Sequence, residues 1–233
     1  MSELHTIRPI AHIKSPFGSK FGVPRQSGIT ESILSDIIFE PQFRDAAALR
    51  GLEDFSHIWL IWLFSESVGG GWSPTVRPPK LGGNKRMGVF ATRSPFRPNN
   101  LGLSCVKIEK ISMSASDGPV ITVSGADLMD GTPIFDIKPY VAYSDSKPDA
   151  VSGFAQCPEK NKLAVKFSAT ACKALPSELI PGLTETLAQD PRPGYQDDKS
   201  RVYKMSYNGF DIGFHISDGC AFVCSVENVK ESY

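Results

Sequence analysis

The chain has 233 residues, 41% of them hydrophobic, and a formal net charge of zero. Such a chain can bury one large core and has room for a small second domain. Zero net charge excludes a protein that attracts acidic partners through bulk positive charge, but the charges are segregated. From Ser67 to Ile108, 42 residues contain no Asp or Glu and seven Lys or Arg. This acid-free window predicts a surface for phosphate or nucleic acid, unless its cations are dispersed in space.

No secretory signal, membrane span or metal site is expected. The N-terminus lacks a basic segment followed by an apolar core, and the longest apolar run, Ile58 to Phe64, is too short to cross a bilayer. The five cysteines are scattered without a Cys-x-x-Cys pair, and the four histidines are equally dispersed. We therefore expect a cytoplasmic protein that has no membrane partner and holds no metal.

The first part of the chain predicts short strands joined by turns. Apolar runs predict strands at residues 4–14, 33–39 and 55–64, the last buried on both faces. A short helix is expected at residues 44–52. Residues 74–84 form a long connection without periodicity, and such connections are usually functional or disordered.

Residues 87–104 are predicted to form the central binding segment, which the rest of the chain supports. A short strand at 87–91 leads into a loop whose prolines restrict the backbone, so that Arg93 and Arg97 extend from a stiff segment. A segment ordered in this way suits binding. A rigid turn between two strands is the alternative.

Three more strands are expected at residues 103–111, 119–124 and 134–143, with a tight turn at Asp130 and Gly131. Short strands, frequent turns and few helix signals predict a mainly β fold. The expected organisation is a small β-barrel domain at 1–145, a polar linker at 146–161 and a small α+β domain at 162–233.

The α+β domain is predicted from a change in pattern. A strand is expected at residues 162–169, leucines in helical register over 171–189 predict a helix, and 203–226 alternates as two or three strands. A second proline-stiffened loop carrying an arginine occupies 190–195.

Several common catalytic motifs are missing from the sequence. There is no Gly-x-Gly-x-x-Gly after a strand, no Gly-x-x-x-x-Gly-Lys-Ser or Thr, no Gly-x-Ser-x-Gly and no His-Glu-x-x-His. A Rossmann-type cofactor fold and the usual hydrolases and zinc peptidases are therefore not supported. The residues alone indicate a β-rich domain with a cationic, proline-stiffened anion site.

A set of longer motifs resembles one known family, the TsaA-like or TrmO family, in the same order along the chain. They are Pro24-Arg25-Gln26, Phe55-Ser56-His57, Gly70-Gly71-Trp72, Arg77-Pro78-Pro79-Lys80-Leu81-Gly82-Gly83, Gly88-Val89-Phe90-Ala91-Thr92-Arg93-Ser94, Phe96-Arg97-Pro98-Asn99, Asp130-Gly131-Thr132-Pro133, Asp136-Ile137-Lys138-Pro139-Tyr140 and Asp190-Pro191-Arg192-Pro193.

The resemblance implies a small non-Rossmann β-barrel that binds S-adenosylmethionine. It implies a tRNA methyltransferase that adds a methyl group to N6 of threonylcarbamoyladenosine beside the anticodon. It also implies a homodimer with sites near the subunit boundary. A non-catalytic cofactor-binding regulator and an RNA-binding adaptor are the alternatives.

The resemblance also implies site residues. At residues 65 and 66 the chain departs from the His-Gln expected there, so those contacts are expected from the backbone. The implied cofactor contacts are Pro24, Arg25, Gln26, Ser65, Glu66, Arg93, Leu103, Asp130, Gly131, Thr132 and Pro133. The residues expected at the RNA are Arg77, Lys80, Lys85, Arg86, Arg97, Arg192 and Tyr195, and the candidate proton acceptors are Asp130, Asp136 and Asp190.

Overall fold

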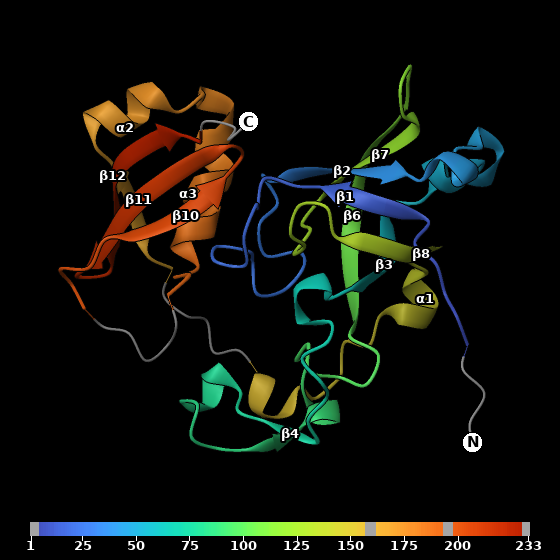
Figure 1. Cartoon of the computed structure of the whole chain (residues 1–233), viewed down its shortest axis with the longest axis horizontal. Helices are drawn as coiled ribbons and strands as arrows, with labels where there is room; N and C mark the ends of the chain where they lie inside the picture. Colours follow the sequence, from blue (N-terminus) through green and yellow to red (C-terminus); the bar gives the residue numbers. More distant parts are fainter. Residues whose placement is uncertain (1–4, 157–161, 193–197, 230–233) are drawn as a thin grey trace.

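The computed structural model describes residues 5–156, 162–192 and 198–229, apart from the Lys80 side chain. Two multi-stranded sheets organise this part of the chain, the first in its N-terminal half and the second near its C-terminus (Figure 1). Helices are few and short. The expectation of a mainly β protein is confirmed.

Six antiparallel strands form the first sheet: β1 (Ala11–Lys14), β2 (Leu34–Phe39), β3 (His57–Leu63), β6 (Leu101–Ser114), β7 (Gly118–Ser124) and β8 (Pro133–Pro139). They follow the order β1-β2-β7-β6-β3-β8, and β1 pairs with β8 to close the ring. Alternate residues, such as Ile58 and Leu60 of β3 and Ile121 and Val123 of β7, are buried inside it. Closure pairs the backbone of strands that would otherwise be edges.

Strand β3 corrects one expectation. Its residues alternate between buried and half-buried positions, so the prediction of burial on both faces is wrong. Ile61 and Trp59 lie on the outer face, where large apolar side chains still cover the sheet. An apolar run therefore did not distinguish a barrel strand with a covered outer face from a fully buried one.

The segment at 44–52 is not the expected short helix. It forms two 3-10 turns, η2 (Ala46–Leu49) and η3 (Leu52–Asp54). The Asp45 carboxylate accepts a hydrogen bond from the Ala47 N–H at 2.9 Å, and Gly51 adopts a positive φ of 86°. The start and stop signals were located correctly, but Gly51 interrupts the segment before an α-helix can propagate.

The acid-free window holds only short elements. Strands β4 (Thr75–Val76) and β5 (Met87–Gly88) pair with each other, and 3-10 turns include η5 (Pro79–Leu81) and η6 (Val89–Ala91). The strand expected at 87–91 is therefore two residues long before the chain turns. The other short helical segments of this half are η1 (Pro41–Phe43), η4 (Ser65–Ser67), α1 (Ala142–Asp145) and η7 (Gly153–Ala155).

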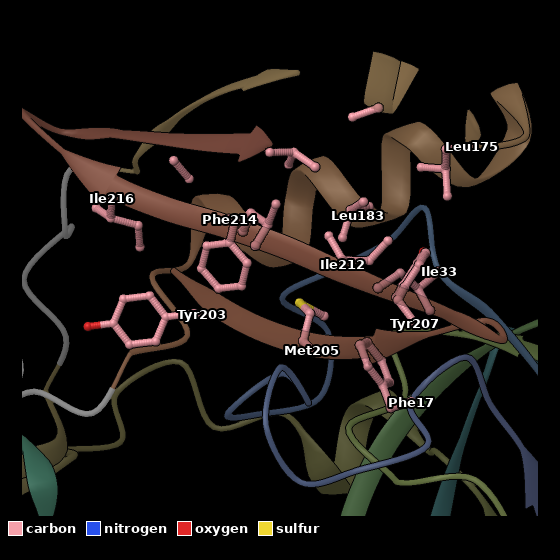
Figure 2. Packing of buried hydrophobic residues seen from close by; sticks show 14 residues of the cluster. Phe17, Ile33, Leu175, Leu183, Tyr203, Met205, Tyr207, Ile212, Phe214 and Ile216 are labelled. Carbon is pink, nitrogen blue, oxygen red and sulfur yellow. The ribbon is translucent and has the colours of Figure 1, made fainter. Parts of the chain in front are cut away.

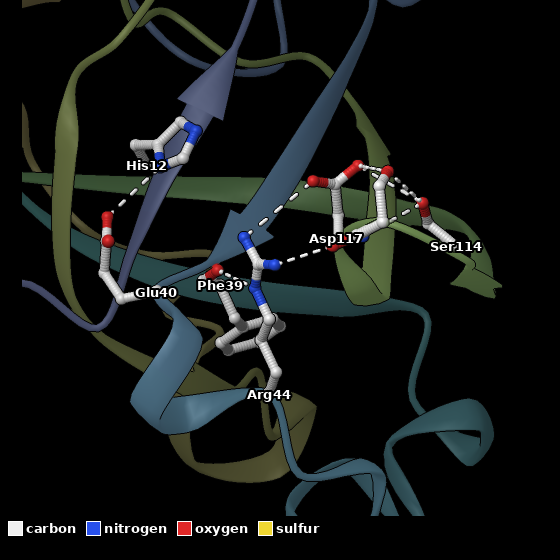
Figure 3. Close-up of polar contacts among 7 residues, drawn as sticks. His12, Phe39, Glu40, Arg44, Ser114 and Asp117 are labelled. Atoms are coloured by element: carbon white, nitrogen blue, oxygen red, sulfur yellow. Dashed lines mark hydrogen bonds and ion pairs between the residues drawn. The ribbon is translucent and has the colours of Figure 1, made fainter.

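Arg44 fastens the end of β2 to the β6–β7 hairpin (Figure 3). Its Nε donates to the Phe39 carbonyl at 2.9 Å, and its Nη1 donates to the Ser116 carbonyl at 2.8 Å. Its Nη2 also lies 3.8 Å from an Asp117 carboxylate oxygen. These contacts hold the end of β2 against the β6–β7 hairpin.

The second sheet has four strands: β9 (Ala164–Phe167), β10 (Tyr203–Tyr207), β11 (Phe210–Ser217) and β12 (Cys220–Asn228). The last three form an antiparallel meander, and β9 runs parallel to β12. Helices α2 (Ala169–Ala174) and α3 (Ile180–Ala188) pack against it. The single helix expected over 171–189 is broken at Pro176, where the proline cannot continue the hydrogen-bond ladder and η8 (Ser177–Leu179) intervenes.

The two halves of the chain share a core, because the long β1–β2 loop packs into the C-terminal sheet (Figure 2). Phe17 and Ile33 from this loop are 0% and 2% exposed and belong to the same cluster as Leu183 and Phe214. The Asn208 N–H donates to the Pro16 carbonyl at 2.6 Å. The predicted domain limits remain a prediction, since the hydrophobic core crosses between the halves.

We predict that Gly102→Ala destabilises the barrel. Residue 102 pairs with Trp62, and a Cβ there would overlap the Trp62 indole ring. Relieving that overlap should cost about 1–3 kcal/mol of unfolding free energy, as overpacked cores do. Urea denaturation of purified protein measures this. Gly88→Ala is the matched control because a Cβ at Gly88 meets open space at a φ of −58°; equal stabilities of the two variants would contradict the prediction.

Candidate functional site

A cavity of about 230 Å³ opens at the end of the barrel where β3 stops. The rings of Trp62 and Phe64 form part of its wall, with centroids 4.3 Å apart. The other lining residues come from the same segment and from three others, so the cavity exists only in the folded chain. They are Lys20, Val23, Leu63, Ser65, Glu66, Ser67, Pro95, Asp127, Met129 and Thr132.

Backbone hydrogen bonds hold the loops around this cavity. The Phe64 N–H donates to the Asn100 carbonyl at 2.9 Å, and the Asn100 side-chain amide donates to the Pro95 carbonyl at 2.7 Å. Asn100 itself has a φ of 48°, a left-handed conformation that asparagine tolerates. The stiff loop at 93–100 is thereby fixed beside the turn that follows β3.

The turn before β8 is pinned from the other side. The Asp130 N–H donates to the Phe17 carbonyl and the Gly131 N–H to the Ile13 carbonyl, both at 2.8 Å. The Ser15 N–H donates to the Asp130 carboxylate at 2.9 Å. These bonds tie Asp130–Thr132 to the end of β1, so the β1–β2 loop and this turn move together.

Asp127 is a half-buried carboxylate in the wall of this cavity. The Trp62 Nε1 donates to the Ser104 hydroxyl at 2.9 Å, and that hydroxyl donates to the Asp127 carboxylate at 2.5 Å. Burial raises the pKa of Asp127 above its ordinary value, although the Ser104 hydrogen bond and the charge of Arg93 oppose the rise. Arg93 also donates a hydrogen bond to the Gln26 side-chain carbonyl.

A second cavity of about 170 Å³ lies between the β1–β2 loop and the C-terminal half. It shares Lys20 and Val23 with the first cavity. Arg25 lines it and donates to the Asp190 and Arg192 carbonyls at 3.2 and 2.9 Å. Arg25 therefore links the β1–β2 loop to the proline-stiffened loop that begins at Asp190.

Asp190 and Arg192 form an ion pair within the second of these loops. The Arg192 Nε lies 2.9 Å from one Asp190 oxygen, and Nη2 lies 2.9 Å from the other. Burial raises the pKa of Asp190, but the hydrogen bonds and charge of Arg192 outweigh it and leave the pKa lowered. The carboxylate is ionised and bidentate, a geometry that fixes the loop.

Comparison with known proteins identifies the family. The N-terminal domain of tRNA-methyltransferase O matches residues 12–146, and the TrmO C-terminal domain matches residues 160–229. This chain belongs to the TrmO family.

Individual relatives resemble the chain over nearly its whole length. The tRNA (adenine(37)-N6)-methyltransferase of Escherichia coli (strain K12) is 41% identical over 226 residues, covering 94% of this chain and 96% of the relative. The Pseudomonas aeruginosa (strain PAO1) protein named "Putative S-adenosylmethionine-dependent methyltransferase RcsF" is 38% identical and covers 91% of this chain and 92% of that one. The crystal structure of TrmO from Pseudomonas aeruginosa superposes with a TM-score of 0.80 at 32% identity, covering 97% and 99% of the two chains.

The fold of this TrmO-family chain brings many of the expected cofactor residues together. Ser65, Glu66 and Thr132 line the first cavity, and Pro24 and Arg25 line the second. The remaining expected contacts near these cavities are Gln26, Arg93, Asp130, Gly131 and Pro133, which lie in the segments just described.

Leu103 is the exception among the expected cofactor contacts. It lies on the outer face of β6, paired with Ile61, and is 57% exposed. It lines neither of the two cavities. Within one copy of the chain, Leu103 is therefore separated from the other expected contacts.

The cations expected at RNA differ in their surroundings. Arg77, Lys85 and Arg86 are exposed, and Arg86 donates to the Thr75 hydroxyl at 2.9 Å. Arg97 is half-buried, donates to the Thr92 carbonyl at 2.7 Å and lies over the Phe90 ring. Its guanidinium thus braces its own loop. Tyr195 and the Lys80 side chain lie outside the described residues.

The candidate proton acceptors occupy three different settings. Asp130 is exposed on its turn and accepts the Ser15 hydrogen bond; Asp136 accepts from its neighbour's N–H and lies 3.2 Å from the Lys138 ammonium; Asp190 pairs with Arg192. The structure does not gather them at one point. None of the three lines the first cavity.

Nine of the twelve residues that line the first cavity were not predicted as site residues: Lys20, Val23, Trp62, Leu63, Phe64, Ser67, Pro95, Asp127 and Met129. One signal was available for Asp127, because it stands between Ala126 and Leu128, two fully apolar neighbours that are both buried. An acid inside a short apolar run indicates a functional or paired carboxylate. In this connection the sequence predicts only the tight turn at Asp130 and Gly131.

Among the described residues, three or more His, Cys, Asp or Glu side chains nowhere gather in a geometry that could hold a metal ion. In the same part of the chain, the helices are all too short or too polar to span a bilayer.

Proposed function

We propose that this protein transfers a methyl group from S-adenosylmethionine to N6 of adenine 37 in tRNA, and that this adenine already carries the threonylcarbamoyl group. One observation carries the proposal. Separate segments that resemble the family's cofactor motifs line two cavities that share Lys20 and Val23, in a chain whose relatives are named tRNA (adenine(37)-N6)-methyltransferases.

The residues around the cavity fit this cofactor. The Trp62 and Phe64 rings offer apolar surface for a purine, the Thr132 hydroxyl can form hydrogen bonds, and the Lys20 ammonium can pair with a carboxylate. When bound, S-adenosylmethionine supplies an electrophilic methyl group on a sulfonium centre. The protein has to hold the acceptor nitrogen close to that methyl and in line with the bond that breaks.

The exposed part of the acid-free window supports the choice of RNA as the second substrate. Arg77, Lys85 and Arg86 present positive charge, and Trp72 and Phe90 lie exposed within the same stretch. Lys and Arg neutralise phosphates, while exposed aromatic rings can stack on unpaired bases at about 1–3 kcal/mol per base. An anticodon loop offers both kinds of group.

The acceptor nitrogen needs help from the protein. Its lone pair is delocalised into the purine and the carbamoyl group, so its N–H proton has to leave during or around transfer. Asp130, Asp136 and Asp190 remain candidates for accepting it, and Asp190 is held in its ionised form by Arg192. Arg192 would approach the RNA from the loop that Arg25 fastens.

The first prediction concerns the reaction. With labelled S-adenosylmethionine, the protein should methylate tRNA that carries threonylcarbamoyladenosine, while tRNA lacking that modification should stay unlabelled. Scintillation counting of precipitated tRNA and mass analysis of its nucleosides measure both. Cofactor binding by calorimetry without transfer to either tRNA would instead support a regulator, and tRNA retention without cofactor binding would support an RNA-binding adaptor.

The second prediction concerns the cationic window. The double substitution Lys85→Ala and Arg86→Ala should weaken tRNA binding and reduce the slope of log affinity against log salt by about 1.5, because two phosphates lose their partners. Filter binding across a salt series measures the slope. The control is Arg50→Ala with Lys110→Ala, which removes two exposed cations outside the window; the same slope change in both pairs would refute a specific phosphate contact.

The proposal includes a homodimer, supported by the position of Leu103. The family resemblance assigns Leu103 to the cofactor, yet its side chain lies outside the cavity of its own chain. A second copy that placed its β6 against the cavity mouth would resolve this difference. It would also bury the exposed Leu103 side chain, and removing apolar surface from water is favourable.

The third prediction tests that arrangement. Leu103→Glu should reduce the mass in solution from two chains to one chain of 25.4 kDa and should also weaken cofactor binding. Light scattering and calorimetry on the same sample measure the two effects. Met113→Glu is the control, since Met113 is an equally apolar, exposed residue at the other end of β6. A monomer that binds cofactor at wild-type affinity would rule the arrangement out.

A further inference from the structure

One carboxylate in the wall of the first cavity has no role in the proposed reaction so far. Asp127 lines the cavity beside Trp62, Met129 and Thr132. It lies in the connection between β7 and β8, where the neighbouring residues Ala126 and Leu128 are each 1% exposed. Burying a carboxylate among apolar groups costs free energy, so its retention at a cavity needs a reason.

Two successive hydrogen bonds orient the Asp127 carboxylate. Ser104 donates to one Asp127 oxygen at 2.5 Å, and Trp62 donates to Ser104 at 2.9 Å. Ser104 and Trp62 are both buried in the barrel wall on neighbouring strands. Since one Asp127 oxygen is occupied by Ser104 and the residue still borders the cavity, the carboxylate has a fixed orientation there.

The charged groups that face Asp127 come from three other segments. Arg93 lies beside it and interacts through its charge, Lys20 borders the cavity from the β1–β2 loop, and Glu66 borders it from the turn after β3. Burial raises the pKa of Asp127, and the Ser104 hydrogen bond and Arg93 limit that rise. A carboxylate with a raised pKa is a stronger base when it is ionised.

We propose that Asp127 is the proton acceptor in the methyl transfer, an inference that rests on the proposed function. The adenine N6 forms its bond to the methyl carbon while the carbon–sulfur bond breaks, and the electron pair of that bond stays on sulfur. The N6 proton passes to Asp127, which becomes a neutral carboxylic acid. Charge balances, because one sulfonium and one carboxylate become a neutral thioether and a neutral acid. Ser104 is a positioning residue in this step.

Asp127 differs from the three acids that the sequence offered. Asp136 and Asp190 are each paired with a cation, which lowers the basicity of a carboxylate, and Asp130 is exposed to solvent. Asp127 alone among these four borders the first cavity. Among these four acids, partial burial without a cationic partner and a place in the cavity wall therefore coincide only at Asp127.

The test is Asp127→Asn, which preserves the shape of the side chain and can still accept the Ser104 hydrogen bond. Single-turnover methylation at saturating cofactor should fall by about 10²-fold or more, the usual contribution of a general base. The dissociation constant for S-adenosylmethionine, measured by calorimetry, should stay close to that of the wild type. Asp36→Asn is the matched control, because Asp36 also accepts from a hydroxyl, that of Thr122 at 2.7 Å, but lies away from the cavity.

Stability supplies a readout that does not depend on activity. The pKa of Asp127 is raised in the folded protein, so the wild type loses stability as pH rises and the buried group ionises. Asp127→Asn should therefore become more stable relative to the wild type between acidic and neutral pH. A variant that is destabilised at every pH would show a structural role for the carboxylate and overturn the inference.

A second variant tests the role of the Ser104 hydrogen bond to the Asp127 carboxylate. Ser104→Ala removes a hydrogen bond that lowers the pKa of Asp127, so the acid limb of the rate profile should move to higher pH. Unchanged methylation by Asp127→Asn, or a loss confined to cofactor affinity, would refute the inference while leaving the proposed function intact. A wild-type protein that methylates no tRNA would refute the proposed function itself.

Discussion

The Trp62 indole can lie flat against β6 only because residue 102, its pairing partner, is a glycine. This contact determines the position of the indole N–H. The N–H then fixes the Ser104 hydroxyl, and that hydroxyl orients Asp127. The absence of a side chain at Gly102 thus determines, through two hydrogen bonds, the position of the Asp127 carboxylate in the cavity wall. The rest of the cavity wall is built around these three groups.

The C-terminal half contributes to the same cavity without lining it. The β1–β2 loop supplies Lys20 and Val23 to the wall, and the same loop is anchored in the C-terminal core through Phe17 and Ile33. Glu185 of α3 also accepts hydrogen bonds from the backbone and side chain of residue 32. A loop this long would lose conformational entropy if it were ordered alone, so its packing against the second sheet makes the wall rigid. The C-terminal sheet is therefore part of what shapes the site.

Periodicity predicted the long elements and missed the short ones. The strand expected at 33–39 is β2, and those at 103–111 and 119–124 fall within β6 and β7. They were predicted because residues of a barrel strand alternate between the interior and the outer face, which gives a period of two in the sequence. Two-residue strands and 3-10 turns leave no such period. At the site, the expected cofactor contacts Ser65, Glu66 and Thr132 line one cavity, and their role in cofactor binding stays a prediction. Asp127 was missed because a carboxylate in a connecting segment indicates a turn by default, and only the folded barrel shows that it is half-buried in the wall of a cavity.

The exposed cations of the acid-free window and the Asp127 carboxylate in the cavity wall have different tasks in the proposed reaction. The cations contribute to RNA affinity, and the carboxylate contributes to proton transfer. Arg77, Lys85 and Arg86 are exposed, and salt screens exposed charges beyond about 8 Å at physiological ionic strength. They can therefore attract a polyanion but act only weakly on a reacting group inside the cavity. Asp127 lies where screening by water is small, so its charge acts at short range on whatever occupies the cavity. An enzyme that must hold RNA and still carry out proton transfer benefits from this division, because substitutions on the surface would alter binding without changing the basicity of the group inside.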